Sequence, residues 1–290
     1  MVHYSAIKAL DGLSLCVKKG EMLGIIGPNG SGKSTLLGSI SRSVRPTGGE
    51  ILVLGKPRDS YSNREYAKIV SALLPTWPSG FNMKSLDIVL MGCRNSTNGF
   101  WWESSEEVKN AEASLSLLNA VDLGTRDFDT LSSGEQRKVM IAKSLAQKTS
   151  IVLLDEPVAY LDLKHKFEVM DVLRSLSREG KTVVVSLHDL DIASKYCDRI
   201  IVLNHGTIVA AGTAREVITS DLIESVYEIK VRVKWDDELE YPIIVPAKLA
   251  SREGGKAWGK SSGTNMELGK SLEACAFQVK LGDHTAGGMG

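Results

Sequence analysis

The feature that most constrains this chain is a glycine-rich segment at residues 27–35, whose sequence is GPNGSGKST. It matches the pattern G-x-x-x-x-G-K-[ST] and stands between an apolar run at residues 22–26 and a helical pattern at residues 34–43. Glycines let the backbone curl so that successive N–H groups face a phosphate, and the start of the following helix adds partial positive charge. The segment therefore predicts a nucleotide phosphate site made of Gly27, Pro28, Asn29, Gly30, Ser31, Gly32, Lys33, Ser34 and Thr35.

Two side chains of this segment have more specific expected roles. The Lys33 ammonium should reach the β- and γ-phosphates of a nucleoside triphosphate, and the Ser34 hydroxyl should coordinate Mg²⁺. The alternative is a glycine-rich turn that binds no ligand. The strand–loop–helix context of the motif favours the phosphate site.

A second motif pairs two carboxylates with the end of an apolar run. Residues 151–154 are IVLL, and Asp155 and Glu156 follow directly. In open α/β folds ligands bind at the carboxyl edge of the sheet, so this arrangement places both acids where a nucleotide would lie. We expect Asp155 to hold Mg²⁺, directly or through water, and Glu156 to orient and deprotonate the attacking water. A strand that simply ends in solvated acids is the alternative.

The pattern of apolar residues predicts the fold class. Continuous runs of β-branched residues and leucine at residues 22–26, 151–154 and 182–185 are typical of strands buried on both faces of a parallel sheet. Helical patterns follow at residues 164–178 and 190–197, whereas residues 85–147 lack strand signals. We therefore expect an α/β fold with a mostly parallel central sheet and a helical insertion. Residues 227–235 and 241–245 should form two short strands around an acidic turn, and residues 272–281 could add one more element.

Composition narrows the class of protein further. The 290 residues are 43% hydrophobic and 24% charged, which excludes wholesale disorder. Thirty-five basic residues balance thirty-five acidic ones, so no general nucleic-acid binder is indicated. The longest uncharged run, residues 69–83, contains two prolines and is shorter than the about 20 apolar residues of a membrane-spanning helix. The four cysteines lie far apart without a CxxC pair, which argues against a zinc site or a disulfide scaffold and fits a reducing cytoplasm.

A third motif, at residues 131–137, completes a pattern that resembles a known family. Residues 131–137, LSSGEQR, open a helical pattern and on their own are an ordinary helix-capping sequence. The order of phosphate loop, this signature, the Asp155–Glu156 pair and then His188 and Asp189 resembles the ATP-binding subunit of ABC transporters, a P-loop NTPase. The resemblance covers residues 1–245 and implies an ABC ATPase domain with an antiparallel edge and a helical subdomain at about residues 85–147. Residues 246–290 are then a glycine-rich C-terminal tail, mobile or a truncated extension.

The resemblance also implies roles for individual residues. Lys33, Glu156 and His188 would be catalytic, with His188 sensing the γ-phosphate of ATP. The signature would contact the γ-phosphate of an ATP held by the opposite subunit, through the start of its helix. The matching positions are Tyr4, which would stack on adenine, Ser132, Ser133, Gly134 and Glu135 of the signature, and Asp162 in the loop that crosses the dimer interface.

Several positions depart from the family pattern. Thr76 stands where glutamine usually touches Mg²⁺ or the lytic water, so the coupling of nucleotide state to the membrane partner is in question. Ser133 replaces a glycine and Glu135 a glutamine in the signature, and Ala159 replaces a common serine in the crossing loop. Only three residues precede Tyr4, so the usual first strand is expected to be cut short.

The resemblance implies a function and a set of partners. The chain would be the ATP-hydrolysing subunit that powers a membrane ABC transporter, and patterns at residues 81–92 and 198–213 resemble importers of iron–siderophore, haem or cobalamin-type chelates. A second copy, transmembrane permease subunits and, indirectly, an extracytoplasmic solute-binding protein are the implied partners at the cytoplasmic face of the plasma membrane. The alternatives are a poorly hydrolysing nucleotide-dependent regulator and a soluble ABC ATPase. Phe100, Trp101 and Trp102 either dock a partner helix or fold under the helical insertion.

Overall fold

A six-stranded sheet forms the centre of the computed structural model, which describes residues 2–4, 7–74, 82–93, 104–236, 238, 241–247 and 275–281. Five strands of this sheet are parallel, and the edge strand β11 pairs antiparallel with β10. The mostly parallel sheet expected from the sequence is confirmed. Its order is β11 (Thr207–Gly212), β10 (Arg199–Asn204), β4 (Met22–Ile26), β9 (Thr182–Ser186), β8 (Ile151–Asp155) and β7 (Val70–Leu73).

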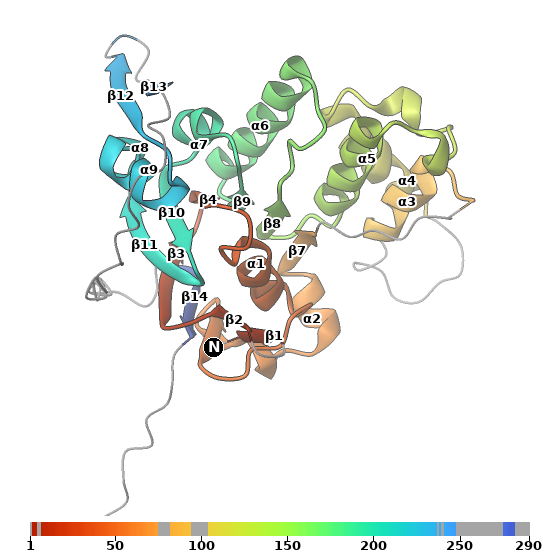
Figure 1. Cartoon of the computed structure of the whole chain (residues 1–290). Helices are drawn as coiled ribbons and strands as arrows, with labels where there is room; N and C mark the ends of the chain where they lie inside the picture. The colour runs from red at the N-terminus through yellow and green to blue at the C-terminus, as the bar shows by residue number, and fades with distance from the viewer. Residues whose placement is uncertain are drawn as a thin grey trace, which may run out of the picture.

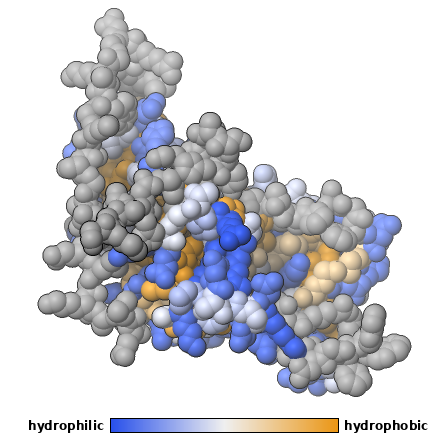
Figure 2. Space-filling view, turned by 90° about the horizontal axis from the view of Figure 1, so that it is seen from below, coloured by the Kyte–Doolittle hydropathy of each residue, from blue (hydrophilic) through white to orange (hydrophobic). Residues whose placement is uncertain are grey.

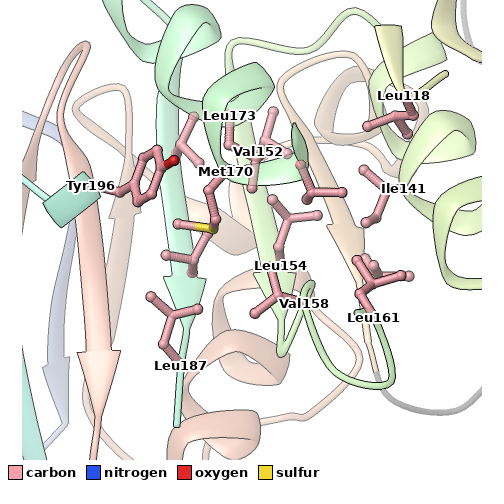
Figure 3. Close-up of a cluster of buried hydrophobic side chains, with 14 of the residues drawn as sticks. Leu118, Ile141, Val152, Leu154, Val158, Leu161, Met170, Leu173, Leu187 and Tyr196 are labelled. Carbon is pink, nitrogen blue, oxygen red and sulfur yellow. The ribbon is translucent and has the colours of Figure 1, made fainter. Parts of the chain in front are cut away.

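Alternate residues of the central strands enter two separate hydrophobic clusters. In β8, Val152 and Leu154 belong to one cluster, whereas Ile151 and Leu153 belong to the other. Figure 3 shows part of the first cluster, in which Val152 and Leu154 lie beside Met170 and Leu173 of α6 (Leu163–Arg178). The second cluster contains side chains of α1 (Lys33–Ser41). Burial on both faces explains why the strands are continuously apolar.

The helical insertion lies to one side of the sheet (Figure 1). Its helices α3 and α5 approach closely, since a Cβ placed on Gly92 would lie 2.2 Å from the Lys143 carbonyl oxygen. A capping box formed by Ser104 and Glu107 starts α4. The insertion predicted for residues 85–147 is thus built of α3 (Ser85–Cys93), α4 (Ser105–Leu117) and α5 (Ser133–Ala146), with short 3-10 helices at Val121–Leu123 and Phe128–Thr130.

A second, antiparallel sheet contains a strand from the far end of the chain. Its order is β3 (Leu13–Lys18), β14 (Cys275–Leu281), β5 (Glu50–Val53) and β6 (Lys56–Pro57). In Figure 1 the blue β14 runs beside the red β3. A separate hairpin joins β1 (Val2–Tyr4) to β2 (Ile7–Leu10). Residues 275–281, inside the segment expected to be a glycine-rich tail, are therefore an internal strand of a sheet.

The expectation that the cysteines form no disulfide is wrong for one pair. Cys16 of β3 and Cys275 of β14 are joined by a disulfide across a sequence separation of 259 residues. Nothing local in the sequence announces this pairing, because the two cysteines meet only through the strand order of the antiparallel sheet. Cys93 and Cys197 are buried and form no disulfide.

The last described part of the chain before β14 is a small helical and hairpin unit. It holds α8 (Ala214–Val217), α9 (Ser220–Tyr227), β12 (Val231–Asp236) and β13 (Tyr241–Pro246). The helix α7 (Leu190–Tyr196) packs against α8 and β13, whereas α2 (Asn63–Ala67) and a 3-10 turn (Arg58–Ser60) lie elsewhere on the fold. The two strands predicted around the acidic turn are confirmed, although the first begins at Val231 because Tyr227 still belongs to α9.

The end of the molecule that carries β1, β2 and α2 in Figure 1 faces the viewer in Figure 2. Hydrophilic residues dominate the coloured part of this view, and hydrophobic areas between them are small. Among the residues that the structure describes, no helix is long and apolar enough to cross a membrane.

Candidate functional site

The phosphate loop joins β4 to α1 and depends on glycine at its two ends. Gly27 has a φ of +147° and Gly32, the residue before α1, has a φ of +106°. A Cβ on Gly27 would lie 2.1 Å from the Leu203 carbonyl oxygen, and one on Gly32 would lie 2.7 Å from the Ala9 carbonyl oxygen. The loop therefore lies close against β10 and β2 and leaves no room for a side chain at Gly27 or Gly32.

We expect Gly27→Ala to lower the free energy of unfolding by about 2–4 kcal/mol, because alanine would be strained at this φ and would collide with backbone. Gly30→Ala is the matched control. Gly30 also has a positive φ, +78°, but no atom within 4 Å of its Cβ position, so its cost should be about 1 kcal/mol. Urea unfolding of both variants measures the difference. Equal losses would show that the close approach to β10 is unimportant.

Lys33 lies inside this loop. Its Nζ donates to the carbonyl oxygens of Gly27 at 2.8 Å and Pro28 at 3.1 Å, and the residue is only 5% exposed. Burial lowers the pKa of the Lys33 ammonium, while the negative charges of Glu156 and Asp155 oppose that shift. The structure thus brings together the lysine and the two acids that the sequence singled out separately.

Asp155 ends β8 and is completely buried. Its Oδ1 accepts a hydrogen bond from the Ser186 hydroxyl at the end of β9. Its Oδ2 is buried and has no hydrogen-bond partner. An unpartnered buried carboxylate oxygen is costly, and a cation or a bound water would satisfy it.

Glu156 follows in a left-handed backbone conformation, with a φ of +50°. This conformation turns the side chain toward the loop after β9, where its Oε1 lies 2.6 Å from His188 Nε2. Both side chains remain partly exposed, at 36% and 44%. A carboxylate and an imidazole at hydrogen-bond distance, both open to solvent at a sheet edge, form a pair that can hold and move a proton.

The side chain of Arg137 donates hydrogen bonds to the backbone of this turn, a role that sequence reasoning did not assign to it. The side chain is 3% exposed and its Nη2 donates to the Asp155 carbonyl oxygen at 2.6 Å. Nε and Nη2 also donate to the Glu156 carbonyl oxygen. Burial lowers the pKa of the Arg137 guanidinium, and the nearby Asp155 and Glu156 charges oppose that effect. The available sequence signal was the position of this arginine at the end of the signature LSSGEQR.

The signature residues start α5 as a capping box. Ser132 Oγ accepts from the Glu135 N–H, and the Glu135 carboxylate accepts from the Ser132 N–H at 2.8 Å. Arg126 pairs with the same carboxylate at 2.7 Å. These hydrogen bonds, led by the one from the Ser132 N–H, lower the pKa of Glu135. The helix start is therefore rigid, and the charge of Glu135 is compensated.

The signature packs directly on the loop that contains Asp162. A Cβ on Gly134 would lie 3.0 Å from the Tyr160 carbonyl oxygen. Asp162 caps α6 by accepting from the His165 N–H at 2.9 Å, and this bond lowers its pKa. Tyr160 in this loop and Leu163 at the start of α6 are 81% and 70% exposed.

Two cavities lie beside different sets of candidate residues. One of about 510 Å³ lies against residues 28–31 of the phosphate loop and Tyr227 of α9. The other, of about 690 Å³, is lined by residues 132–135 and 160–162. No residue of the phosphate loop lines the cavity at the signature.

Some predicted positions cannot be placed. Thr76 and the aromatic residues at 100–102 lie outside the described residues. Tyr4 lies in β1, but its side chain is also outside the description. No group of three or more His, Cys, Asp or Glu side chains suited to a metal ion occurs in the part of the chain that the structure describes.

Comparison with known proteins decides the family. The family described as ABC transporter matches residues 10–159. The chain belongs to this family. The chain is 36% identical to a siderophore transport system ATP-binding protein of Bacillus subtilis, covering 84% of this chain and 89% of the relative. It is 35% identical to a hemin import ATP-binding protein of Thermobifida fusca, covering 84% and 86%.

A solved structure of a dimeric ATP-binding cassette bound to ADP and phosphate is 30% identical, with a TM-score of 0.67, over 72% of this chain and 92% of that one. The fold of this ABC transporter subunit is thus that of an ABC ATPase. As an ATP-binding subunit of this family, it hydrolyses ATP to power transport. The regulator and soluble-ATPase alternatives are not favoured by these relatives.

Proposed function

We propose that this subunit works from the cytoplasmic face of the membrane to power import of an iron–siderophore, haem or cobalamin-type chelate. Its relatives with importer names support the cargo class by similarity. No residue of an ATP-hydrolysing subunit needs to touch the cargo, so the cargo itself is inferred by association. Permease subunits are the direct partners in this proposal, and an extracytoplasmic solute-binding protein acts indirectly.

The observation that carries the ATPase mechanism is the meeting of Lys33, Asp155, Glu156 and His188 around one sheet edge. In this proposal Lys33 leaves its two carbonyl partners to contact the ATP phosphates, with backbone N–H groups of residues 29–35 around them. Glu156 takes a proton from the attacking water. His188, held 2.6 Å from Glu156, orients that carboxylate and faces the developing charge.

The residues present fit Mg²⁺. Asp155 offers a buried, unpartnered Oδ2, and the Ser34 side chain at the start of α1 is exposed. Magnesium is typically held by one or two protein oxygens together with substrate phosphates, so a larger carboxylate cluster is not required. Bound there, the ion would neutralise phosphate charge. Asp155 and Ser34 would be its protein ligands.

A second copy completes each nucleotide site in the proposed assembly. The cavity at the signature is lined by no residue of the phosphate loop, and the similar solved cassette is a dimer. Tyr160 and Leu163, exposed beside the signature, are suited to burial between copies. ATP would then join the two surfaces, and loss of its γ-phosphate would remove the contact that favours the closed dimer.

We expect Ser132→Ala to weaken ATP-driven dimerisation about tenfold or more, because the loss of a hydroxyl and a helix cap at the phosphate costs more than 1 kcal/mol. The measurement is sedimentation velocity with ATP in the Glu156→Gln background. Ser104→Ala is the matched control, since Ser104 forms the same capping box with Glu107 on α4. A dimer unchanged by Ser132→Ala, or weakened equally by Ser104→Ala, would argue against a signature contact.

The cargo is tested by uptake. Cells that lack this subunit should lose ATP-dependent uptake of one of ferric siderophore, hemin or cobalamin and regain it with the intact chain but not with Glu156→Gln. Phosphate release by the purified protein with ATP and Mg²⁺ is measured in parallel. Normal uptake of all three ligands in the deleted strain would refute the cargo class while leaving the ATPase intact.

A further inference from the structure

The position of β14 in the antiparallel sheet is the starting point. The strand pairs on one side with β3, where Val279 lies opposite Leu15, and on the other side with β5, where it lies opposite Ile51. The Leu54 N–H also donates to the Ala276 carbonyl oxygen at 2.9 Å. Without β14, β3 and β5 would face each other across an empty strand position.

The side chains of β14 belong to the same hydrophobic cluster as the phosphate-loop helix. Phe277, Val279 and Leu281 are each 1% exposed. Their cluster includes Leu36 and Leu37 of α1, the helix that begins at Lys33. Displacement of β14 would therefore open the core on which α1 is seated.

A short backbone path leads from β14 to the phosphate loop. Leu281 lies opposite Leu13, the first residue of β3. Three residues earlier, Leu10 packs against Gly32: a Cβ placed on Gly32 would lie 2.8 Å from Leu10 Cδ2. Next to Leu10, the Asp11 N–H donates to the Gly206 carbonyl oxygen at 3.0 Å. Any shift of β3 would thus reach the turn that starts α1.

A disulfide attaches the first residue of β14, Cys275, to Cys16 of β3, at the end of the strand opposite Leu281. Cys16 and Cys275 have their Cα atoms 6.1 Å apart, and Cys16 is partly exposed whereas Cys275 is buried. The Cys16 carbonyl oxygen also accepts from Arg199, which pairs with Glu21 beside β4 at 2.8 Å. Burial raises the pKa of the Cys93 and Cys197 thiols, which disfavours the thiolate form that could exchange with this bond.

We propose that the Cys16–Cys275 pair is a thiol–disulfide exchange site that fastens β14 into the sheet and thereby sets the affinity of the phosphate loop for ATP. The reductant is a dithiol. Its first thiolate attacks Sγ of the more exposed Cys16, and Cys275 leaves as a thiolate that takes up a proton. The second thiol of the reductant then displaces Cys16, which is protonated, and a disulfide of the reductant is released.

In the reduced protein β14 is held only by its sheet hydrogen bonds and packing. A strand whose covalent tie is gone opens locally more often, and each opening exposes the edges of β3 and β5 and loosens α1. β8 and β9 also place side chains in the other hydrophobic cluster, to which β14 contributes none, so the central sheet stays folded on that face. Reduction therefore lowers ATP affinity without unfolding the molecule, and the reverse exchange, in which the disulfide form of a dithiol is reduced as Cys16 and Cys275 are oxidised, restores it.

The test compares the full chain as oxidised, after treatment with dithiothreitol, and after reoxidation. We expect reduction to raise hydrogen exchange at the amides of β3, β5 and β14, to leave those of β8 protected, and to weaken ATP binding about tenfold, within the range of coupling between protein sites. The double variant Cys16→Ser/Cys275→Ser should match the reduced form and ignore dithiothreitol. Cys197→Ser, a buried free cysteine, should keep the full response.

Three results would overturn the proposal. Equal ATP affinity and equal β14 protection in both states would make the bond a passive crosslink. Simultaneous loss of protection in β8 and β14 would make it a global stabiliser. A disulfide-linked dimer on a non-reducing gel, lost on reduction, would show that Cys16 and Cys275 pair between copies.

Discussion

Replacement of Glu156 by glutamine is expected to lower ATP turnover about 10²–10⁴-fold, the usual contribution of a general base, while ATP binding is retained. Glutamine keeps the size of the side chain and a hydrogen-bonding contact with His188, but it cannot accept a proton from water. The substitution therefore separates binding from chemistry. Phosphate release gives turnover, and equilibrium dialysis with ATP gives affinity.

Glu179→Gln is the control for this variant, because Glu179 is an exposed acid that follows α6 and precedes β9, whereas Glu156 and His188 follow the opposite, carboxyl ends of β8 and β9. Its turnover should equal that of the parent. His188→Ala should also lower turnover, since Glu156 would lose the partner 2.6 Å away. Unchanged turnover in Glu156→Gln would move the role of base to another residue.

The parts of the site that sequence alone predicted are those whose chemistry is local. The phosphate loop carries its glycines, lysine and serine within nine consecutive positions, and Asp155 and Glu156 directly follow the strand that presents them. The continuous apolar runs likewise predicted a sheet that is buried on both faces. Local signals of this kind need no knowledge of which distant elements meet.

The features that sequence missed depend on which elements and side chains pack together in the fold. Arg137 reaches the carbonyl groups of residues 155 and 156 only because α5 packs against the end of β8. β14 enters a sheet whose other strands lie more than two hundred residues earlier, so Cys16 and Cys275 gave no hint of their disulfide. A helix-capping pattern predicted the start of α5, but not that Glu135 would also pair with Arg126.

Arg137→Met should lower the free energy of unfolding by about 2–4 kcal/mol, because the buried carbonyl groups of Asp155 and Glu156 lose their charged donor. Methionine fills a similar length of apolar space, so packing is largely kept. ATP turnover should fall by more than the smaller fraction of folded protein would explain. Glu156 has a φ of +50°, and without Arg137 the strained turn can relax and carry the carboxylate away from His188.

The test must separate this positioning role from simple destabilisation. We expect kcat to fall about tenfold or more at a temperature where the variant is fully folded, with little change in KM for ATP, because the phosphate loop lies on another strand. Arg126→Met is the matched control: Arg126 also pairs with an acid, Glu135, but is partly exposed and distant from Glu156 in the chain. It should cost no more than about 1 kcal/mol. If Arg137→Met lost stability while keeping its kcat, the arginine would brace the fold without setting the position of Glu156.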